Sequence, residues 1–337
     1  MHPFCQMLVD TGYLLTYSLV IKVKRLTRRK GKKMTKSKKK WNSIKLFLMI
    51  LPFLVLVIMF AYYPLYGWLY AFYDYKPPKL LSNCPFVGLK WFKSLVSNEV
   101  KIKQLLQVLK NTFAMSTIVL GTSWIPMLFA VFLNEIKCVP YRKFVQTVTT
   151  LPNFVSWVLV YSIAFSLFSS NGMMNTFLMN LGVIKEPIMF LQSSEHVWLT
   201  QWLWLTWKNL GWAAIMYIAA ISGIDEEMFQ AAKVDGASRM QIIRHITIPS
   251  LLPTFFVLLM INTANFLNNG MEQYFVFQNA FNKDFIQVLD LYVFNLAMGS
   301  GGYSVSVAVS MLKSLVSVVL LVVLNTVSKL TRGESFL

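Results

Sequence analysis

The stretch I-D-E-E-M-F-Q-A-A-K-V-D-G-A-S-R-M-Q-I-I-R-H-I-T-I-P, residues 224–249, is charged but rich in helix-forming residues. Glu226–Val234 favours a helix, and Gly236 can adopt the left-handed conformation that commonly ends one. An S-x-x-Q capping box at Ser238 starts a second short helix, which we expect Pro249 to close. The pattern predicts a helix, a turn and a helix that lie outside the hydrocarbon core of a membrane.

Apolar segments lie on both sides of this stretch, and more follow along the chain. A bilayer's hydrocarbon core is about 30 Å thick, so a spanning helix needs about 20 apolar residues. Of the 337 residues, 56% are hydrophobic and 14% are charged, which argues against a soluble enzyme. We expect an all-α, polytopic membrane protein with six transmembrane helices, at Ile44–Tyr63, Thr112–Leu133, Phe144–Phe168, Val197–Ile221, Leu251–Asn269 and Val305–Val327.

The basic residues predict the orientation. Residues 22–45 carry 13 Lys/Arg and no acid, and positive charge favours the cytoplasmic side. The chain's net charge of +18 therefore comes mostly from one stretch and does not indicate a nucleic-acid partner. We expect both termini and residues 224–249 to be cytoplasmic.

The domain prediction follows from these boundaries. Residues 1–33 are expected to be disordered, or to be an upstream extension of the reading frame before Met34. The predicted parts are a basic N-terminal segment at 1–43, a six-helix domain at 44–330 and a cytoplasmic tail at 331–337.

Two long outer connections, Asp74–Asn111 and Gly270–Ser304, are expected to contain structure of their own. Within the first, Glu99–Lys110 fits either an amphipathic helix near the membrane surface or a solvated connector. Both interpretations stay open on the residues alone.

Signatures of catalysis are absent from the sequence. Cys5, Cys84 and Cys138 are far apart and have no metal-ligand spacing. There is no nucleotide-binding P-loop, no dinucleotide motif and no nucleophile elbow. We expect no catalytic residue, no metal ligand and no bound cofactor in this chain, so any ATP and Mg²⁺ would belong to a separate ATPase.

Small side chains make residues 224–249 a candidate docking surface. Ala231, Ala232, Gly236 and Ala237 would let the groove of a cytoplasmic partner approach closely. The alternative is an ordinary polar loop, although most connections between helices run only about 2–8 residues.

The run Q-A-A-K-V-D-G-A-S-R-M-Q-I-I-R-H-I-T-I-P resembles the E-A-A-x-x-D-G-A…I-x-L-P signature of permease subunits in binding-protein-dependent ABC importers. The resemblance covers about residues 44–337. Within the family it is most similar to carbohydrate permeases, in particular those for complex oligosaccharides. The stretches that carry this are P-L-Y-G-W-L-Y-A-F-Y-D-Y-K (Pro64–Lys76), V-G-L-K-W-F from Val87, L-P-N-F-V-S-W (Leu151–Trp157) and Y-S-V-S-V-A (Tyr303–Ala308).

The resemblance implies a mechanism and a set of partners. Residues 224–249 would form the cytoplasmic coupling helix, which sits in a cleft of the ATPase. The implied partners are a second homologous permease, two cytoplasmic ATPase subunits, an extracellular solute-binding protein and a carbohydrate, in a bacterial plasma membrane. Gln230 replaces the family's leading glutamate, so the hydrogen-bonding reach is kept and the charge is lost. The implied coupling residues are Gln230, Ala231, Ala232, Asp235, Gly236, Ala237 and Pro249.

Polar and aromatic residues in the fourth and fifth spans are candidates for a solute pathway. On an ideal helix, Asn262, Asn265 and Asn269 would share one face, where amides suit sugar hydroxyls. The alternative is hydrogen bonding that holds the helices together. In the fourth span, Trp204, Trp207 and Trp212 could stack on sugar rings, whereas Trp198 and Trp202 are assigned to the headgroup region. Lys208 could contact solute, snorkel or pair with a helix end. Lys313, in the last span, has no partner that the sequence identifies.

Other functions remain as alternatives. The same importer could carry another polar solute, such as a peptide-like molecule or a sugar phosphate. A secondary transporter would want a buried carboxylate, and the six predicted spans contain no Asp or Glu. Uptake without ATP would favour such a carrier.

Overall fold

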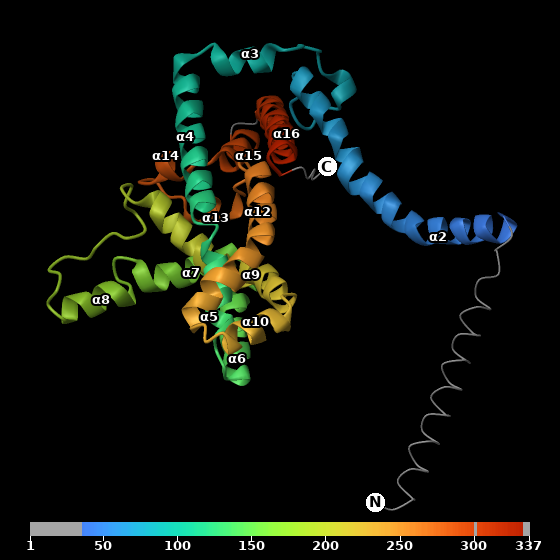
Figure 1. Ribbon diagram of the computed structural model, residues 1–337. Helices are drawn as coiled ribbons and strands as arrows, with labels where there is room; N and C mark the ends of the chain where they lie inside the picture. Colours follow the sequence, from blue (N-terminus) through green and yellow to red (C-terminus); the bar gives the residue numbers. More distant parts are fainter. Residues whose placement is uncertain (1–35, 300–301, 333–337) are drawn as a thin grey trace, which may run out of the picture. The chain divides into compact units, whose positions relative to one another are not determined.

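The computed structural model describes residues 36–299 and 302–332, and most of this part of the chain is helical (Figure 1). The chain separates into two compact units, Met1–Tyr66 and Gly67–Leu337. The expectation for residues 1–33 lies outside the described residues. The predicted tail at 331–337 begins inside α16, which runs to Arg332, and the rest of it lies outside the described residues.

The described part of the first unit is one helical run, which becomes apolar after Lys45. Helix α2 (Lys36–Val57) contains Pro52 and runs into a π-helical turn, η1 (Ile58–Tyr62), and a 3₁₀ helix, η2 (Tyr63–Phe72). The predicted domain start at residue 44 therefore lies inside a helix.

The second unit holds the remaining helices. The 3₁₀ and π elements are η3 (Leu81–Asn83), η4 (Leu151–Phe154) and η5 (Ile243–Thr247). The α-helices are α3 (Lys90–Val96), α4 (Glu99–Gly121), α5 (Ile125–Asn134), α6 (Val139–Thr150), α7 (Trp157–Phe168), α8 (Met173–Asn180), α9 (Val197–Ser222), α10 (Glu226–Val234), α11 (Arg239–Ile242), α12 (Ile248–Ala264), α13 (Glu272–Phe277), α14 (Lys283–Ile286), α15 (Leu289–Gly299) and α16 (Tyr303–Arg332).

In the described part of the chain, five helical segments are long and apolar enough to cross a membrane. Predicted span four, α9, is not among them, although it is 26 residues long, because its tryptophans and polar residues lower its hydropathy. The chain is therefore a multi-pass membrane protein. Counted with α9 for its length, the candidate spans among the described residues number six, although Trp157–Asn180 stands in place of the predicted Phe144–Phe168. The five segments are Ile44–Phe72, Glu99–Asn134, Trp157–Asn180, Arg239–Ala264 and Tyr303–Val323.

Helix α9 is the centre of the second unit. It packs against α4, α5, α6 and α12. Its buried residues recur every three or four positions, as on one face of a helix, and include Gln201, Lys208, Gly211 and Ala214. A hydrophobic core cluster joins Ala214 and Tyr217 of α9 to α5 and α12. The polar residues Gln201 and Lys208 thus lie on the buried face of α9, which explains how a membrane helix can carry them.

Two predicted spans are broken. Thr112–Leu133 consists of the end of α4 and all of α5, because the helix is interrupted just before Pro126. Glu99–Lys110 is the first half of α4, so it is neither a separate surface helix nor a connector. Phe144–Phe168 is also wrong as one span. It consists of α6 and α7, separated by a corner at η4 that contains Pro152.

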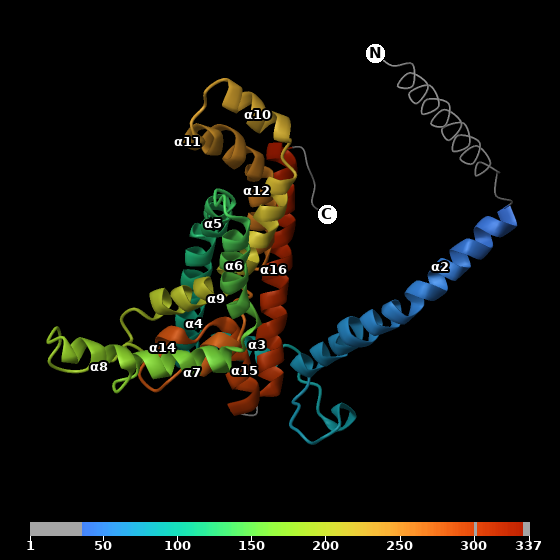
Figure 2. The same ribbon diagram turned by 90° about the horizontal axis from the view of Figure 1, so that it is seen from below.

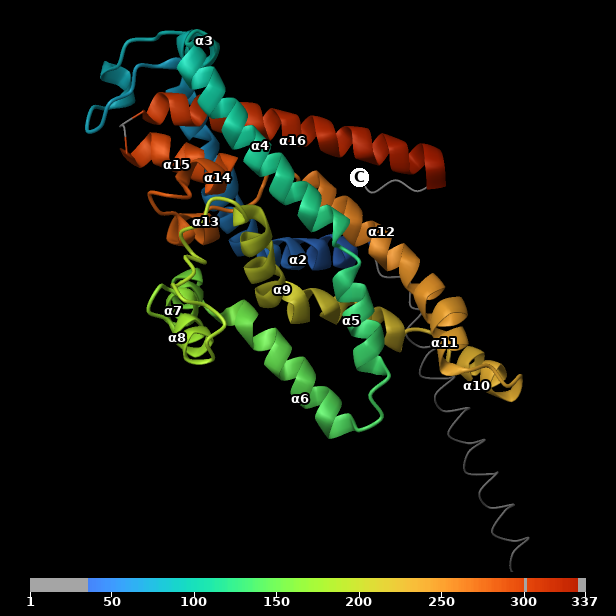
Figure 3. The same cartoon turned by 90° about the vertical axis from the view of Figure 1, so that its left-hand side faces the viewer.

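The two ends of the second unit differ in structure. Figure 2 shows α10 and α11 beyond one end of the bundle, and α7 and α8 running crosswise at the other end, near α14 and α15. In Figure 3, α10 and α11 again lie away from α7, α8, α14 and α15. The predicted outer connections therefore contain structure, and they lie at the end opposite residues 224–249.

Candidate functional site

The loop between α9 and α12 has the predicted local structure. Asp225 caps α10 by accepting from the amide of Glu227 at 3.0 Å. Gly236 has φ +77°, as the turn requires. Ser238 and Gln241 form the capping box of α11, each side chain bonding the other's backbone amide. The helix, glycine turn and second helix are confirmed.

The predicted end of the second helix at Pro249 is wrong. Helix α11 continues through the π-helical turn η5 into α12, and Pro249 lies in the first turn of α12. A proline ring clashes with the carbonyl four residues earlier, and a wider turn relieves that clash. The same arrangement occurs in the first unit, where the π-turn η1 precedes Pro64. The second half of the loop is therefore rigidly joined to a membrane span.

Apolar side chains are exposed on this loop. Val234 is 88% exposed, Met240 66% and Met228 48%. An ideal Cβ on Gly236 would meet nothing within 4 Å, so the fold itself does not exclude a side chain there. The exposed apolar side chains stand among charged ones, which is typical of a surface that a partner covers.

The structure places the predicted coupling residues together on this loop. Gln230 donates from Nε2 to the Glu226 carboxylate at 3.3 Å, so an acid lies beside the position where the family's own acid is missing. Asp235 follows α10 as its C-terminal cap. Of the small residues and the proline, Ala231, Gly236 and Pro249 are exposed, and Ala232 and Ala237 are half-buried.

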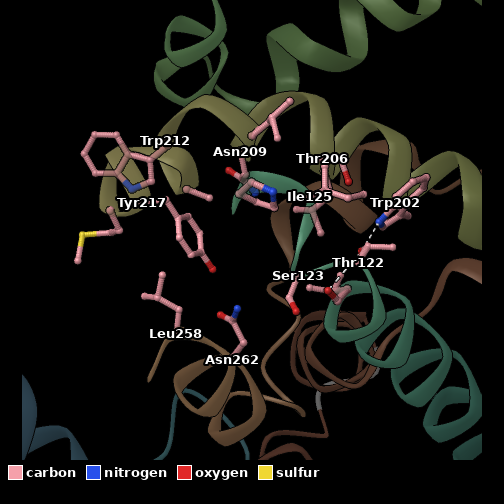
Figure 4. Close-up of a pocket in the computed structure, with 16 residues that line it drawn as sticks. Thr122, Ser123, Ile125, Trp202, Thr206, Asn209, Trp212, Tyr217, Leu258 and Asn262 are labelled. Carbon is pink, nitrogen blue, oxygen red and sulfur yellow. Dashed lines mark hydrogen bonds between the residues drawn. The ribbon is translucent and has the colours of Figure 1, made fainter. Parts of the chain in front are cut away.

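A cavity of about 420 Å³ lies between α4, α5, α9 and α12. Figure 4 shows its wall: α9 supplies Trp202, Thr206, Asn209 and Trp212 along one side. These recur at three- or four-residue spacing, as one helix face. The remaining lining residues are Val119, Thr122, Ser123, Ile125, Pro126, Leu205, Leu210, Ala213, Met216, Tyr217, Leu258 and Asn262.

The lining of the cavity is mostly apolar, and the polar groups within it are uncharged. Hydroxyl groups come from Thr122, Ser123 and Thr206, and amides come from Asn209 and Asn262. The indole Nε1 of Trp202 donates to the Thr122 hydroxyl at 2.9 Å, and this bond joins α9 to the end of α4. Hydroxyls and amides both donate and accept hydrogen bonds, so these groups suit a hydroxyl-bearing solute.

Two of the predicted pathway residues, Asn262 and Trp212, line this cavity. The predicted asparagine face is wrong, because α12 ends at Ala264. Asn265 then follows as the C-terminal cap and donates to the carbonyl of Ile261 at 3.0 Å. Asn269 instead donates to the Ser116 hydroxyl of α4 at 3.1 Å. These two amides hold the backbone and the neighbouring helix.

The other predicted residues of α9 lie outside the cavity. Trp204 packs edge-to-face against Trp207 and Phe168, next to the cluster formed by α7 and α13. Lys208 is 7% exposed and binds carbonyls of the η4 corner. The sequence left three alternatives for Lys208, and the structure shows the one in which it pairs with a helix end.

The sequence reasoning missed Thr122, Ser123, Thr206, Asn209 and Tyr217, and it was wrong to assign Trp202, which lines the cavity, to the headgroup region. A signal for part of this set was available, because Thr206, Asn209 and Trp212 recur every three residues along α9. The others come from a helix break and from packing, which the sequence does not reveal. Lys313, whose partner was unknown, forms an ion pair with Asp290 of α15.

No group of three or more His, Cys, Asp or Glu that could hold a metal ion occurs within residues 36–299 and 302–332. The exposed loop and the uncharged cavity are therefore the two candidate sites.

Residues 139–332 match the family described as binding-protein-dependent transport system inner membrane component. The chain belongs to this family. The permease is 34% identical over 286 residues to the polygalacturonan/rhamnogalacturonan transport system permease protein YteP of Bacillus subtilis (strain 168), covering 84% of this chain and 87% of that protein. It is 33% identical over 288 residues to Protein LplB of the same organism, covering 84% and 88%.

A solved structure gives the same result for the fold. The permease matches a chain of a bacterial alginate ABC transporter, crystallised in complex with an alginate pentasaccharide-bound periplasmic protein, with a TM-score of 0.77 and 29% identity. The match covers 88% of this chain and 98% of the other. The chain is thus an ABC-importer permease by family and by fold.

Proposed function

We propose that this permease forms half of the translocation pathway of an importer for an oligosaccharide or a complex glycan. The observation that carries the proposal is the uncharged cavity, in which hydroxyls and amides stand beside Trp202 and Trp212. Sugars offer hydroxyls to the first set and apolar ring faces to aromatic side chains. The relatives support the same substrate class, since their names refer to polygalacturonan, rhamnogalacturonan and alginate.

The same proposal assigns the exposed loop to coupling. Its apolar side chains would be covered by a cytoplasmic ATPase, which would bind ATP and Mg²⁺ in place of this chain. The continuous helix from α11 through η5 into α12 would carry the ATPase's movement to Asn262, since that residue is on α12. The loop residues that would make this contact are Gln230, Ala231, Ala232, Asp235, Gly236, Ala237 and Pro249.

The assembly that follows contains a second permease subunit, two ATPases and an extracellular solute-binding protein. A periplasmic protein bound to its saccharide accompanies the alginate transporter in the solved complex, which supports the last of these partners. The basic stretch at residues 22–45 supports a cytoplasmic N-terminus in a bacterial plasma membrane. Six spans would then leave the C-terminus cytoplasmic as well.

Uptake into proteoliposomes that contain the permease with its partner subunits and binding protein tests the proposal. The labelled panel would comprise rhamnogalacturonan, polygalacturonan and arabinan oligosaccharides, maltotriose, a tripeptide and glucose 6-phosphate. We expect ATP-dependent uptake of at least one saccharide. Uptake of the tripeptide or the sugar phosphate alone would indicate a different solute, and uptake without ATP would indicate a secondary transporter.

A matched pair of variants tests the cavity. Asn262→Ala removes an amide that lines it, and a lost hydrogen bond is worth about 0.5–1.5 kcal/mol, or roughly two- to tenfold in binding. Asn268→Ala removes an exposed amide on the same segment that does not line the cavity. We expect the half-saturating saccharide concentration to rise only in Asn262→Ala. Equal values in the two variants would contradict the assignment of the cavity to the solute.

A further inference from the structure

Lys208 is the single charged residue of α9, and its hydrogen bonds explain how it can be buried. Its Nζ donates to the carbonyl oxygens of Pro152 at 3.1 Å, Asn153 at 2.7 Å and Val155 at 2.7 Å. The same Nζ lies 5.4 Å from the centre of the Trp157 ring. Three carbonyls use all three N–H bonds of an ammonium group, so none remains for a solute.

These carbonyls are available because α6 and α7 meet at a corner. Helix α6 ends at Thr150, the short element η4 contains Pro152, and α7 begins at Trp157. A helix end leaves carbonyls without helical donors, and burying them unpaired costs about 1–3 kcal/mol each. The Pro152 carbonyl also accepts from the Val155 amide at 3.2 Å, whereas the carbonyls of Asn153 and Val155 are bonded by Lys208. Lys208 thus joins α9 to the corner.

The next residues of α9 contact the same corner. Asn209 Oδ1 accepts from Asn153 Nδ2 at 3.0 Å. The ring of Trp212 meets the ring of Phe154 edge-to-face, with centroids 5.8 Å apart. Between them Gly211 lies so close to the backbone that an ideal Cβ would be 2.3 Å from the carbonyl oxygen of Thr149. Residues 149–155 are therefore held against one stretch of α9. The contacts come from the side chains of Lys208, Asn209 and Trp212 and from the backbone of Gly211.

This stretch of α9 also forms the cavity wall. Asn209 and Trp212 both line the cavity, and Figure 4 shows them on the same helix beside it. The bond from Asn153 holds the Asn209 side-chain oxygen at the corner and so limits the rotation of a side chain that lines the cavity. The ring contact with Phe154 likewise limits the rotation of Trp212. The corner and the wall are thus one packed unit.

We propose that Lys208 is a positioning residue for solute binding: by clamping the α6–α7 corner to α9, it fixes Asn209 and Trp212 in the cavity wall. This inference rests on the proposed function, since Asn209 and Trp212 act on the solute that passes the cavity. Lys208 itself touches no solute. Removing it is therefore expected to weaken saccharide binding more than it slows the transport cycle.

Lys208→Met tests the inference, and Lys313→Met is its matched control. Both replace a buried or half-buried lysine of a membrane helix, but Lys313 pairs with Asp290, which does not line the cavity, whereas Lys208 holds the corner that contacts Asn209 and Trp212. With the panel saccharide that the wild type takes up, we expect Lys208→Met to raise the half-saturating concentration at least fivefold. Lys313→Met should leave that concentration within twofold. Lys208→Arg should restore most of the loss, because a guanidinium also offers several N–H donors.

A second variant keeps the test valid if Lys208→Met fails to reach the membrane. Asn153→Ala breaks the bond to Asn209 and leaves the Lys208 contacts in place, because these use only backbone carbonyls. We expect it to reach the membrane normally and to raise the half-saturating concentration two- to fivefold. Wild-type half-saturation in Asn153→Ala, or in a stably inserted Lys208→Met, would overturn the inference.

A readout without saccharide separates this inference from the proposed function. Thr206→Cys places a reporter in the cavity wall at a position outside the corner contacts. We expect Lys208→Met to change its rate of labelling by a membrane-impermeant maleimide at least threefold, and Lys313→Met to leave the rate within twofold. An unchanged rate would overturn the positioning role. A wild type that takes up no panel saccharide would overturn the proposed function alone.

Discussion

The loop at residues 224–249 and the contact between α9 and the α6–α7 corner each depend on a glycine, for opposite reasons. Gly236 of the loop has a positive φ, and an added Cβ would meet nothing within 4 Å. Gly211 of α9 has an ordinary helical backbone, but an added Cβ would lie 2.3 Å from the Thr149 carbonyl oxygen. The first glycine is required by the local turn and leaves an open surface, whereas the second is required by a neighbouring helix.

Gly236 therefore bears on the docking of a partner, whereas Gly211 bears on the folding of the bundle. An exposed turn can be altered with little effect on the rest of the chain, so its sequence reflects what binds to it. A buried contact between helices supports the whole bundle, so its sequence reflects packing. Substitutions at the two glycines should therefore affect different measurements.

The largest effect on uptake is expected from Gly236→Asp. Aspartate tolerates the left-handed backbone at a cost of about 1–2 kcal/mol, so the chain should still fold, but the side chain would project into the space of the docked ATPase. We expect saccharide uptake to fall at least tenfold at membrane abundance within twofold of wild type, measured by uptake and immunoblotting.

Gly182→Asp is the control for Gly236→Asp. Gly182 has φ +69° and equally open surroundings on the loop after α8, so it carries the same backbone strain at a site away from coupling. Uptake should be nearly unchanged. If both variants lose uptake equally, backbone strain is the cause and the coupling role of Gly236 is wrong.

The next largest effect is expected from Gly211→Ala, and on stability. Overpacking a close contact costs about 1–3 kcal/mol, so the thermal midpoint of the detergent-purified complex should fall. Gly121→Ala, where nothing lies within 4 Å of the added Cβ, should leave the midpoint unchanged. A wild-type thermal midpoint in Gly211→Ala would show that α9 and the α6–α7 corner can move apart without loss of stability.

The smallest effect is expected from Gln230→Glu, which restores the family's acid. Glu226 already places a carboxylate 3.3 Å from the Gln230 side chain, so a second one adds like-charge repulsion of a few tenths of a kcal/mol between exposed groups. ATPase activity coupled to uptake should change less than twofold. A tenfold increase in the coupled ATPase activity would mean that the charge at residue 230, and not the shape of the loop, limits docking.

Local features of the loop were predictable from the sequence because each depends on residues a few positions apart. The caps at Asp225 and Ser238 and the turn at Gly236 follow from short-range hydrogen bonds and from φ. Pro249 was predicted to end a helix, yet the chain continues through a π-turn. The rule for proline does not say whether a helix will break or widen, and here the continuing span decides it.

The cavity was only partly predictable. Asn262 and Trp212 were identified as polar or aromatic residues inside spans, and both line it. Asn265 and Asn269 were placed on the same face because the prediction assumed a helix beyond Ala264. Lys208 was correctly recognised as unusual, but its carbonyl partners belong to a helix break that apolar length alone does not reveal.

The sequence by itself determined that this chain spans a membrane several times, which side is expected to hold its charges, and where a helical loop interrupts the spans. Those properties depend on composition and on short-range periodicity. Only the tertiary structure decided that Lys208 closes a corner 53 to 56 residues earlier in the chain, and that Asn209 and Trp212 are held in a cavity wall. The reason is physical: a carbonyl left unpaired by one helix must find a donor in space, and the sequence does not record which helix supplies it.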